Sequence, residues 1–253
     1  MAGVLRHICR HPIKSLGWEE VSSVTLSPDQ TLPFDRHWAL AHEAAGFDPD
    51  APTWRSKRDF VRGVASAPLM AIRAKLSEDA KTLSLTHPDR PPLELQPDRE
   101  ECSTALVDWV APLWPDTRPA AHRLVSAGAT QALTDVEPPY ISLLSLNSLR
   151  DLSENMGQDL SMHRWRGNLW FDGIAPWEEF DWLGREIAVG PVRLRVEDRI
   201  TRCMATEANP ETGKFDAKTL DSLEKFYGHQ DFGIYARVVA GGPLRTGDPL
   251  VVS

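Results

Sequence analysis

Cys203 is the side chain in this sequence best placed to bind a metal or attack a substrate. It lies in the stretch Arg199-Ile-Thr-Arg-Cys203, directly after a predicted strand and beside Arg202. Neighbouring cations favour the thiolate form of a cysteine, which is the form that ligates metals. The stretch Asn209-Pro-Glu-Thr-Gly213 that follows predicts a tight turn in which the glycine has a positive φ. Local features leave a second interpretation equally open, a buried cysteine that packs as a small hydrophobe.

Basic side chains stand at the ends of several predicted strands. Lys14 and Ser15 follow the first strand, Arg36 precedes another, and Arg164 and Arg166 precede a third. Such cations, with nearby hydroxyls and amides, suit an anionic ligand such as a phosphate. Taken singly, each cation is better explained as a solvated surface charge. The sequence does not establish that these side chains converge.

Two weaker patterns also carry chemical groups. His7, Cys9 and His11 alternate along the first strand and could share one face as soft metal ligands. Side chains two residues apart on a strand diverge, however, whereas a zinc site draws its ligands from separate elements. Four other carboxylates, which show no spacing that identifies a general acid and base, are Asp172, Glu178, Glu179 and Asp181.

Short strands with few helices are expected to position these groups. Strands are predicted at 4–10, 21–26, 38–41, 69–76, 82–86, 168–171, 185–189, 192–196, 235–239 and 249–252. Helices are predicted at 103–113, after a cap at Ser145 or Asn147, and at 217–227 before Gly228. Prolines between 88 and 97 and at both ends of 115–139 predict irregular chain there. Antiparallel hairpins are favoured over βαβ crossovers, and the expected class is mainly β with some α (α+β), built around β-barrels.

Composition restricts the class of protein. The chain has 253 residues and a formal net charge of −8, which argues against nucleic acid as a partner. No stretch approaches the roughly 20 apolar residues of a membrane span, so we expect no membrane partner and a cytoplasmic location. Three scattered cysteines exclude a disulfide framework and a cysteine-only metal cluster. Neither a GxGxxG nor a P-loop motif occurs, which disfavours nucleotide-binding folds.

A set of short motifs resembles the MOSC family, in the two-part form that begins with an N-terminal MOSC β-barrel segment and includes amidoxime-reducing relatives. They occur in the order found in the family: Pro12-Ile-Lys-Ser15, Asp35-Arg-His-Trp38, the run from Leu143 to Leu149, Arg166-Gly-Asn-Leu169, Arg202-Cys203 with the Asn209–Gly213 turn, and Gly247-Asp-Pro-Leu250. The resemblance therefore covers nearly the whole chain. It implies an N-terminal β-barrel-like domain at 1–117 and a MOSC domain at 118–253.

The resemblance also implies a molybdenum cofactor (molybdenum-molybdopterin) as the ligand. Cys203 would be the catalytic residue and would ligate the metal. The cofactor would be bound by Lys14, Ser15, Arg36, Arg166 and Asn168, with Ser145 and Thr201 as further neighbours. A thiolate is a soft ligand suited to such a metal, and the pterin phosphate is an anion that scattered cations would neutralise.

The activity implied by the resemblance is reduction of small N-hydroxylated or N-oxygenated compounds. This sequence shows no cysteine-rich ferredoxin segment. The electron donor is therefore expected to be a separate ferredoxin- or cytochrome-type reductase protein. The alternative is a non-redox carrier that moves sulfur or the cofactor through a persulfide on Cys203. A degenerate binding domain that retains the fold without turnover is a third hypothesis.

Overall fold

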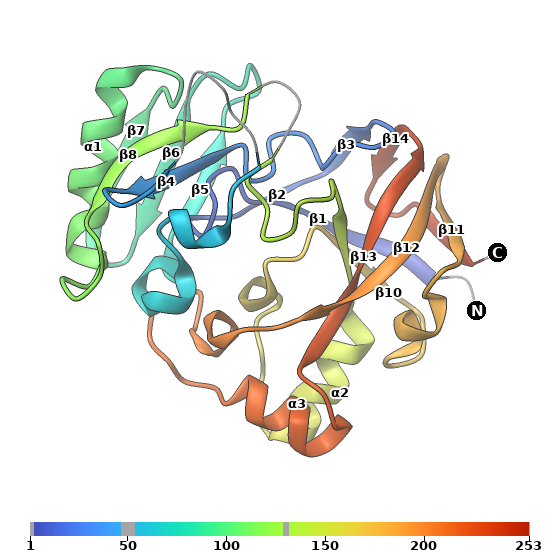
Figure 1. Cartoon of the computed structure of the whole chain (residues 1–253). Coiled ribbons are helices and arrows are strands. Elements are labelled where there is room, and N and C mark those ends of the chain that lie inside the picture. The colour runs from blue at the N-terminus through green and yellow to red at the C-terminus, as the bar shows by residue number, and fades with distance from the viewer. Residues whose placement is uncertain (1–2, 47–53, 129–131, 253) are drawn as a thin grey trace.

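The computed structural model describes residues 3–46, 54–128 and 132–252. Its central feature is a closed barrel of seven strands in the order β1-β10-β9-β13-β12-β11-β15, with β15 pairing back onto β1. The barrel strands are β1 (Gly3–Arg10), β9 (Ile141–Ser145), β10 (Leu169–Asp172), β11 (Glu186–Val189), β12 (Val192–Thr201), β13 (Asp231–Ala240) and β15 (Pro249–Val252). Figure 1 shows both ends of the chain on the same side of the barrel.

The barrel interior is apolar because each strand directs alternate residues inward. Leu5 and Ile8 of β1 pack there with Val196 of β12 and Ile234 of β13. A tight turn at Gly190, which has a φ of +52°, joins β11 to β12 and confirms the predicted hairpin. The strand β2 (Glu19–Val21) extends the sheet beside β1, and β14 (Gly242–Arg245) pairs with β3 (Ser23–Leu26).

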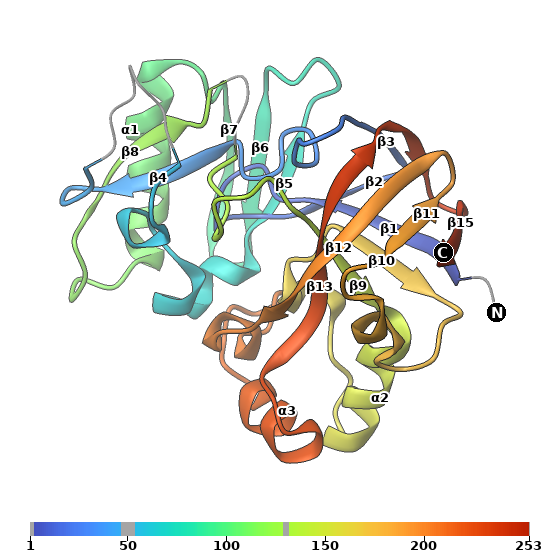
Figure 2. The same ribbon diagram turned by 45° about the vertical axis from the view of Figure 1, so that its right-hand side comes forward.

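Two helices cover the barrel on one side. Helix α2 (Leu146–Met156) starts at the predicted cap Ser145, and helix α3 (Thr219–Tyr227) ends at Gly228 in the left-handed conformation. Helix α2 connects β9 to β10, which lie parallel to each other. The sequence favoured antiparallel pairing over crossovers, and the other barrel pairs are antiparallel, but this pair is an exception because a crossover helix allows neighbouring strands to run in the same direction. Figure 2 shows both helices below the barrel.

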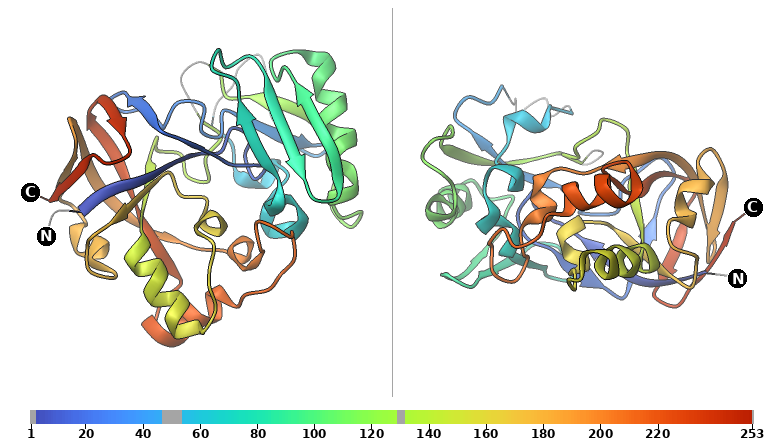
Figure 3. Two further views of the ribbon diagram at one scale, coloured as in Figure 1. Left: turned by 180° about the vertical axis from the view of Figure 1, so that it is seen from behind. Right: turned by 90° about the horizontal axis from the view of Figure 1, so that it is seen from below.

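A second group of elements lies beside the barrel. Its strands and helix are β4 (Trp38–His42), β5 (Arg73–Leu76), β6 (Leu83–His87), β7 (Arg90–Leu95), α1 (Glu100–Val110) and β8 (Ala121–Ser126). β4 pairs with β8, and β5, β6 and β7 form a three-stranded sheet, which Figure 3 shows from behind. Helix α1 packs against β8 and buries Leu106 and Trp109 in a separate core.

Three local predictions were wrong in this second group. β7 contains two prolines, which it tolerates because it is an edge strand and need not donate every ladder hydrogen bond. β8 lies within the stretch that was expected to be irregular. The predicted strand 69–76 divides into a 3-10 turn, Ala67–Ala71, and the short strand β5.

Strand pairing crosses the proposed domain boundary at residue 117 in both directions. β1 from the first part completes the barrel of the second part, and β8 from the second part pairs with β4. The division into 1–117 and 118–253 therefore stays a prediction about sequence segments. Among the described residues, no helix has the length and apolar character that crossing a membrane requires.

Candidate cofactor-binding site

A cavity of about 230 Å³ brings together seven of the eight side chains that the sequence predicted for the site. Its wall is formed by elements of the barrel and by the short 3-10 turns of the second group. The predicted residues that line it are Lys14, Ser15, Arg36, Arg166, Asn168, Thr201 and Cys203. Residues more than 180 positions apart in the sequence thus face one space.

Ser145 is the predicted residue that lies outside this wall. It is fully buried, and its Oγ accepts a hydrogen bond of 3.1 Å from the backbone N–H of Ser148. This hydroxyl therefore caps helix α2, the first of its two predicted roles. Ser142, three residues earlier on the same strand, lines the cavity instead.

Cys203 lies at the end of β12, where the strand passes into the 3-10 turn η7 (Met204–Glu207). Its side chain is exposed and lines the cavity, so the interpretation as a buried hydrophobe is wrong. Thr206 holds the turn by donating from both its N–H and its Oγ1 to the carbonyl of Cys203, each at 3.1 Å. The thiol is thus presented to the cavity by an ordered turn.

The loop after Cys203 forms the predicted tight turn. Gly213 has a φ of +64°, and its N–H donates to the carbonyl of Asn209 at 2.9 Å. A Cβ at position 213 would lie 2.8 Å from the Cα of Pro68. Glycine is therefore required here both for the backbone conformation and for the close approach to the second group of elements.

The two arginines near Cys203 have different roles. Arg202 lines the cavity and donates to the carbonyls of Phe232 and Trp165, the latter at 2.8 Å. Arg199 lies outside the cavity wall, with its guanidinium carbon 4.2 Å from the ring centroid of Phe180. Of these two arginines, only Arg202 therefore adds positive charge to the cavity.

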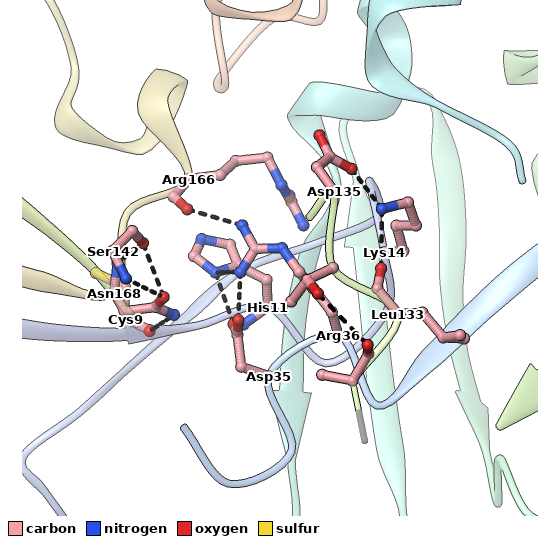
Figure 4. Close-up of polar contacts among 12 residues, drawn as sticks. Cys9, His11, Lys14, Asp35, Arg36, Leu133, Asp135, Ser142, Arg166 and Asn168 are labelled. Carbon is pink, nitrogen blue, oxygen red and sulfur yellow. Dashed lines mark hydrogen bonds and ion pairs between the residues drawn. The ribbon is translucent and has the colours of Figure 1, made fainter. Parts of the chain in front are cut away.

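Lys14 is a buried cation, and 2% of its side chain is exposed. Its Nζ donates to the carbonyl of Leu133 at 2.8 Å and to Asp135, as Figure 4 shows. Burial lowers the pKa of Lys14, although the neighbouring Asp135 opposes this effect. Ser15 follows with a φ of +62°, an uncommon conformation for a residue other than glycine, where the chain turns sharply after β1.

Arg36 is fixed by a compact network. Its Nη1 donates to Asp35, and its Nη2 donates to the carbonyl of Arg166 at 2.9 Å (Figure 4). Asp35 also accepts from the N–H of His11 at 2.8 Å, and the Nδ1 of His11 lies 3.0 Å from the same carboxylate. Burial tends to raise the pKa of Asp35, but the charge of Arg36 and the bonds from His11 outweigh it and hold that pKa low.

Arg166 and Asn168 connect strands that are distant in the sequence. Arg166 donates to the carbonyls of Gly17 at 2.9 Å and Ile13 at 3.3 Å. The amide of Asn168 accepts from the N–H and Oγ of Ser142 and donates to the carbonyl of Cys9 (Figure 4). Asn168 is 2% exposed and uses its amide to join β1, β9 and β10. Its main role in this structure is to hold the strand ends that carry the other side chains.

The cavity wall has a large excess of positive charge. Among the described residues it contains seven cationic side chains and one carboxylate: Lys14, Arg36, Lys57, Arg62, Arg164, Arg166 and Arg202, with Asp135. Burial and the charge of Arg36 lower the pKa of Arg166, and burial lowers that of Arg202. Within a chain of net charge −8, this concentration of cations strongly favours an anionic ligand.

Two buried donors in the wall lack partners among the residues that the structure describes. They are the Nε of Arg164 and the Nε1 of Trp165, and these residues are 2% and 1% exposed. An unpaired buried donor costs free energy, so such groups point to a ligand with acceptor atoms. The predictions missed Lys57, which lies in a 3-10 turn, and Arg62, which directly precedes another, because these short segments have no periodic sequence pattern.

The alternative metal set on β1 does not converge. His7 pairs with Glu20 at 2.8 Å near the surface, Cys9 is buried in an apolar cluster, and His11 bonds Asp35. Burial is the main cause that raises the pKa of Cys9, which keeps its thiol protonated. In the part of the chain that the structure describes, no three His, Cys, Asp or Glu side chains are grouped to hold a metal.

Comparison with known proteins agrees with the sequence motifs. The family model "MOSC N-terminal beta barrel domain" matches residues 2–115, and the model "MOSC domain" matches residues 137–251. The human mitochondrial amidoxime reducing component 2 is 34% identical over 128 residues, which cover 45% of this chain and 37% of that protein. Molybdenum cofactor sulfurase 2 of Culex quinquefasciatus is 24% identical over 281 residues, covering 91% of this chain and 34% of that protein.

The chain thus matches less than two fifths of the length of either relative. Among solved structures, the YUAD protein from Bacillus subtilis is 10% identical and has a TM-score of 0.46, with 99% of this chain and 94% of that chain covered. The two family models together span most of the sequence, in the order that the motifs predicted. The chain belongs to the MOSC family and carries a MOSC N-terminal beta barrel domain followed by a MOSC domain.

Proposed function

We propose that this protein binds a molybdenum cofactor through Cys203 and reduces small N-hydroxylated or N-oxygenated compounds. The observation that carries the proposal is the shared cavity, in which one exposed thiol faces a wall of seven cationic side chains and one carboxylate. Two relatives, one named an amidoxime reducing component and the other a molybdenum cofactor sulfurase, support a molybdenum cofactor as the ligand.

The residues present fit this cofactor chemically. A thiolate is a soft ligand of the kind that molybdenum accepts, and Cys203 is accessible from the cavity. Lys14, Arg36 and Arg166 would hold the phosphate, because each is buried or partly buried in the wall and a phosphate would balance their charge. The unpaired donors of Arg164 and Trp165 would hydrogen-bond the acceptor atoms of a pterin. Ser15 and Thr201 would add hydroxyl groups at the same wall.

The cofactor would supply a redox-active metal centre that removes oxygen from the substrate. The residues of this chain would position the cofactor, restrict the access of water to the cavity and hold protons. Val64, Met70 and Val136 provide apolar surface beside the thiol. Burial raises the pKa of Tyr235, so its Oη keeps a proton facing the cavity at neutral pH. Reduction of an N–OH group to N–H and water consumes two electrons and two protons, and we propose a separate ferredoxin- or cytochrome-type protein as the electron donor.

The proposal is tested by metal analysis and turnover. Freshly purified protein is expected to contain close to one molybdenum and one pterin per chain, and to reduce benzamidoxime when a chemical reductant supplies electrons. Cys203→Ala should abolish this activity and leave the unfolding midpoint of the cofactor-free protein unchanged, because the side chain is exposed. Cys102→Ala, in helix α1 away from the cavity, is the matched control and should retain both properties. Full activity in Cys203→Ala would exclude the ligand assignment.

The carrier hypothesis is kept as the second candidate, because the alignment to the Culex sulfurase extends over 91% of the chain. It requires the same exposed thiol but no external reductant. Mass spectrometry would then find a persulfide on Cys203 in protein without molybdenum. The absence of metal, pterin and persulfide would exclude both candidates.

A further inference from the structure

Arg62 differs from the other arginines of the cavity. Five wall cations are held by the protein itself: Lys14, Arg36, Arg164, Arg166 and Arg202 each donate to a backbone carbonyl. Arg62 is only partly buried, lines the same cavity and has no side-chain hydrogen bond or ion pair within residues 3–46, 54–128 and 132–252. Its guanidinium is therefore free to bind a ligand.

The position of Arg62 is nevertheless fixed by its backbone. It precedes the 3-10 turn η2 (Gly63–Ala65), and its carbonyl accepts from the N–H of Ala65 at 3.0 Å. A Cβ at Gly63 would lie 2.6 Å from the Sδ of Met70 and 3.7 Å from the Cβ of Ala205, which is two residues beyond Cys203. The turn that carries Arg62 thus packs against the turn that carries the thiol.

We infer that Arg62 binds an oxyanion on the substrate, so that the preferred substrates are N-oxygenated compounds bearing a carboxylate or phosphate. This inference rests on the proposed function. A guanidinium binds such groups through two parallel hydrogen bonds and retains its charge at all physiological pH values. Val64, Met70 and Ala205 line the cavity beside it and would contact a small apolar body that links the anion to the N–OH group.

Charge balance supports an anion beyond that of the cofactor. The group already assigned to the phosphate is Lys14, Arg36 and Arg166, of which Arg36 and Arg166 are joined by the bond from Arg36 to the carbonyl of Arg166. Within the described residues, Arg62 makes no hydrogen bond or ion pair with this group, and it comes from a different element. In the described part of the chain, the wall holds a single carboxylate, Asp135, which pairs with Lys14 and leaves Arg62 without a counter-charge. A second phosphate on the cofactor is the competing source of the same oxyanion chemistry.

The test compares two substrates that differ by one para carboxylate group, benzamidoxime and 4-carboxybenzamidoxime. Wild-type holoprotein should show a kcat/KM for the carboxylated compound about tenfold or more above that for the neutral one, because a charge-assisted bidentate contact is worth that much. Arg62→Gln should remove this preference through KM, and Arg62→Lys should restore part of it. Arg193→Gln, an exposed cation on β12 outside the cavity wall, is the matched control and should keep the wild-type preference.

A binding measurement separates this inference from the proposed function. Calorimetry with the unreactive 4-carbamoylbenzoate and benzamide should give about tenfold tighter binding of the anion to wild type, and equal binding to Arg62→Gln. If the protein carries molybdenum and reduces both substrates equally, the inference is overturned while the proposed function stands. Loss of molybdenum in Arg62→Gln overturns it in favour of a cofactor phosphate. Anion-selective binding without any reduction would instead contradict the proposed function alone.

Discussion

Replacing Glu179 by glutamine should change how the stability of this protein responds to pH. Glu179 lies in the 3-10 turn Glu178–Trp182, and 2% of it is exposed. Both oxygens of its carboxyl group accept from the Oγ of Ser148 at 2.9 Å, and no cation pairs with it among the described residues. Burial raises the pKa of Glu179 to about 7, although the hydrogen bonds oppose this effect.

The sign and size of the effect follow from this pKa. The folded state holds the proton more tightly than the unfolded state, in which the pKa is near 4.5. The contribution of Glu179 to stability is therefore fully present below pH 4.5 and is lost as the pH rises to about 7. One pKa unit corresponds to about 1.4 kcal/mol, so the loss amounts to about 3 kcal/mol in the free energy of unfolding.

Urea unfolding followed by tryptophan fluorescence between pH 4.5 and 8 would measure this difference. Glu179→Gln keeps the shape of the side chain and cannot ionise, so its free energy of unfolding should rise relative to wild type by about 3 kcal/mol across that range. Glu154→Gln removes an exposed carboxylate from helix α2 and corrects for the change in net charge. Parallel pH profiles of wild type and Glu179→Gln would refute the reasoning.

Two further substitutions separate residues that hold the site together from residues that contact a ligand. Asn168→Ala should lower the free energy of unfolding by about 2–3 kcal/mol, because it leaves the carbonyl of Cys9 without this buried donor and the N–H and O–H of Ser142 without their buried acceptor; a loss below about 0.5 kcal/mol in urea unfolding would contradict this role. Ser145→Ala should cost about 1 kcal/mol through the lost helix cap and leave the molybdenum content unchanged. Metal analysis that finds the cofactor depleted in folded Ser145→Ala would show that this residue contributes to binding after all.

Strongly patterned segments of this chain could be predicted from the sequence. Alternating residues predicted the strand β1, and a Gly-Pro turn predicted the hairpin of β11 and β12. A serine cap predicted the start of α2, and a terminal glycine predicted the end of α3. These four predictions were confirmed because each signal acts locally. The parallel pairing of β9 and β10 was not predictable from these signals, since both strands are buried and their direction depends on the crossover helix.

The candidate site shows the same distinction. Lys14, Arg36, Arg166 and Cys203 stand next to strand ends or recognisable motifs, and the cavity does bring them together. Arg62 precedes a 3-10 turn that packs against the cysteine turn, and Lys57 lies in another 3-10 turn, so no local sequence pattern identifies either residue. Ser145 is the opposite case. It belongs to a family motif and was assigned to the cofactor site, but its hydroxyl accepts a hydrogen bond that caps helix α2.

The barrel closes through its first strand, and this has a consequence for how the protein is made. β1 emerges from the ribosome first, yet its partners β10 and β15 follow about 160 and 240 residues later. Until then β1 can pair only with β2, through Ile8, Cys9 and Arg10, and the edges that face β10 and β15 stay unpaired. Contacts so distant in sequence slow folding, and exposed strand edges invite aggregation meanwhile. A fragment limited to 137–251 would leave the barrel open between β10 and β15, so expression of that segment alone should yield aggregating protein.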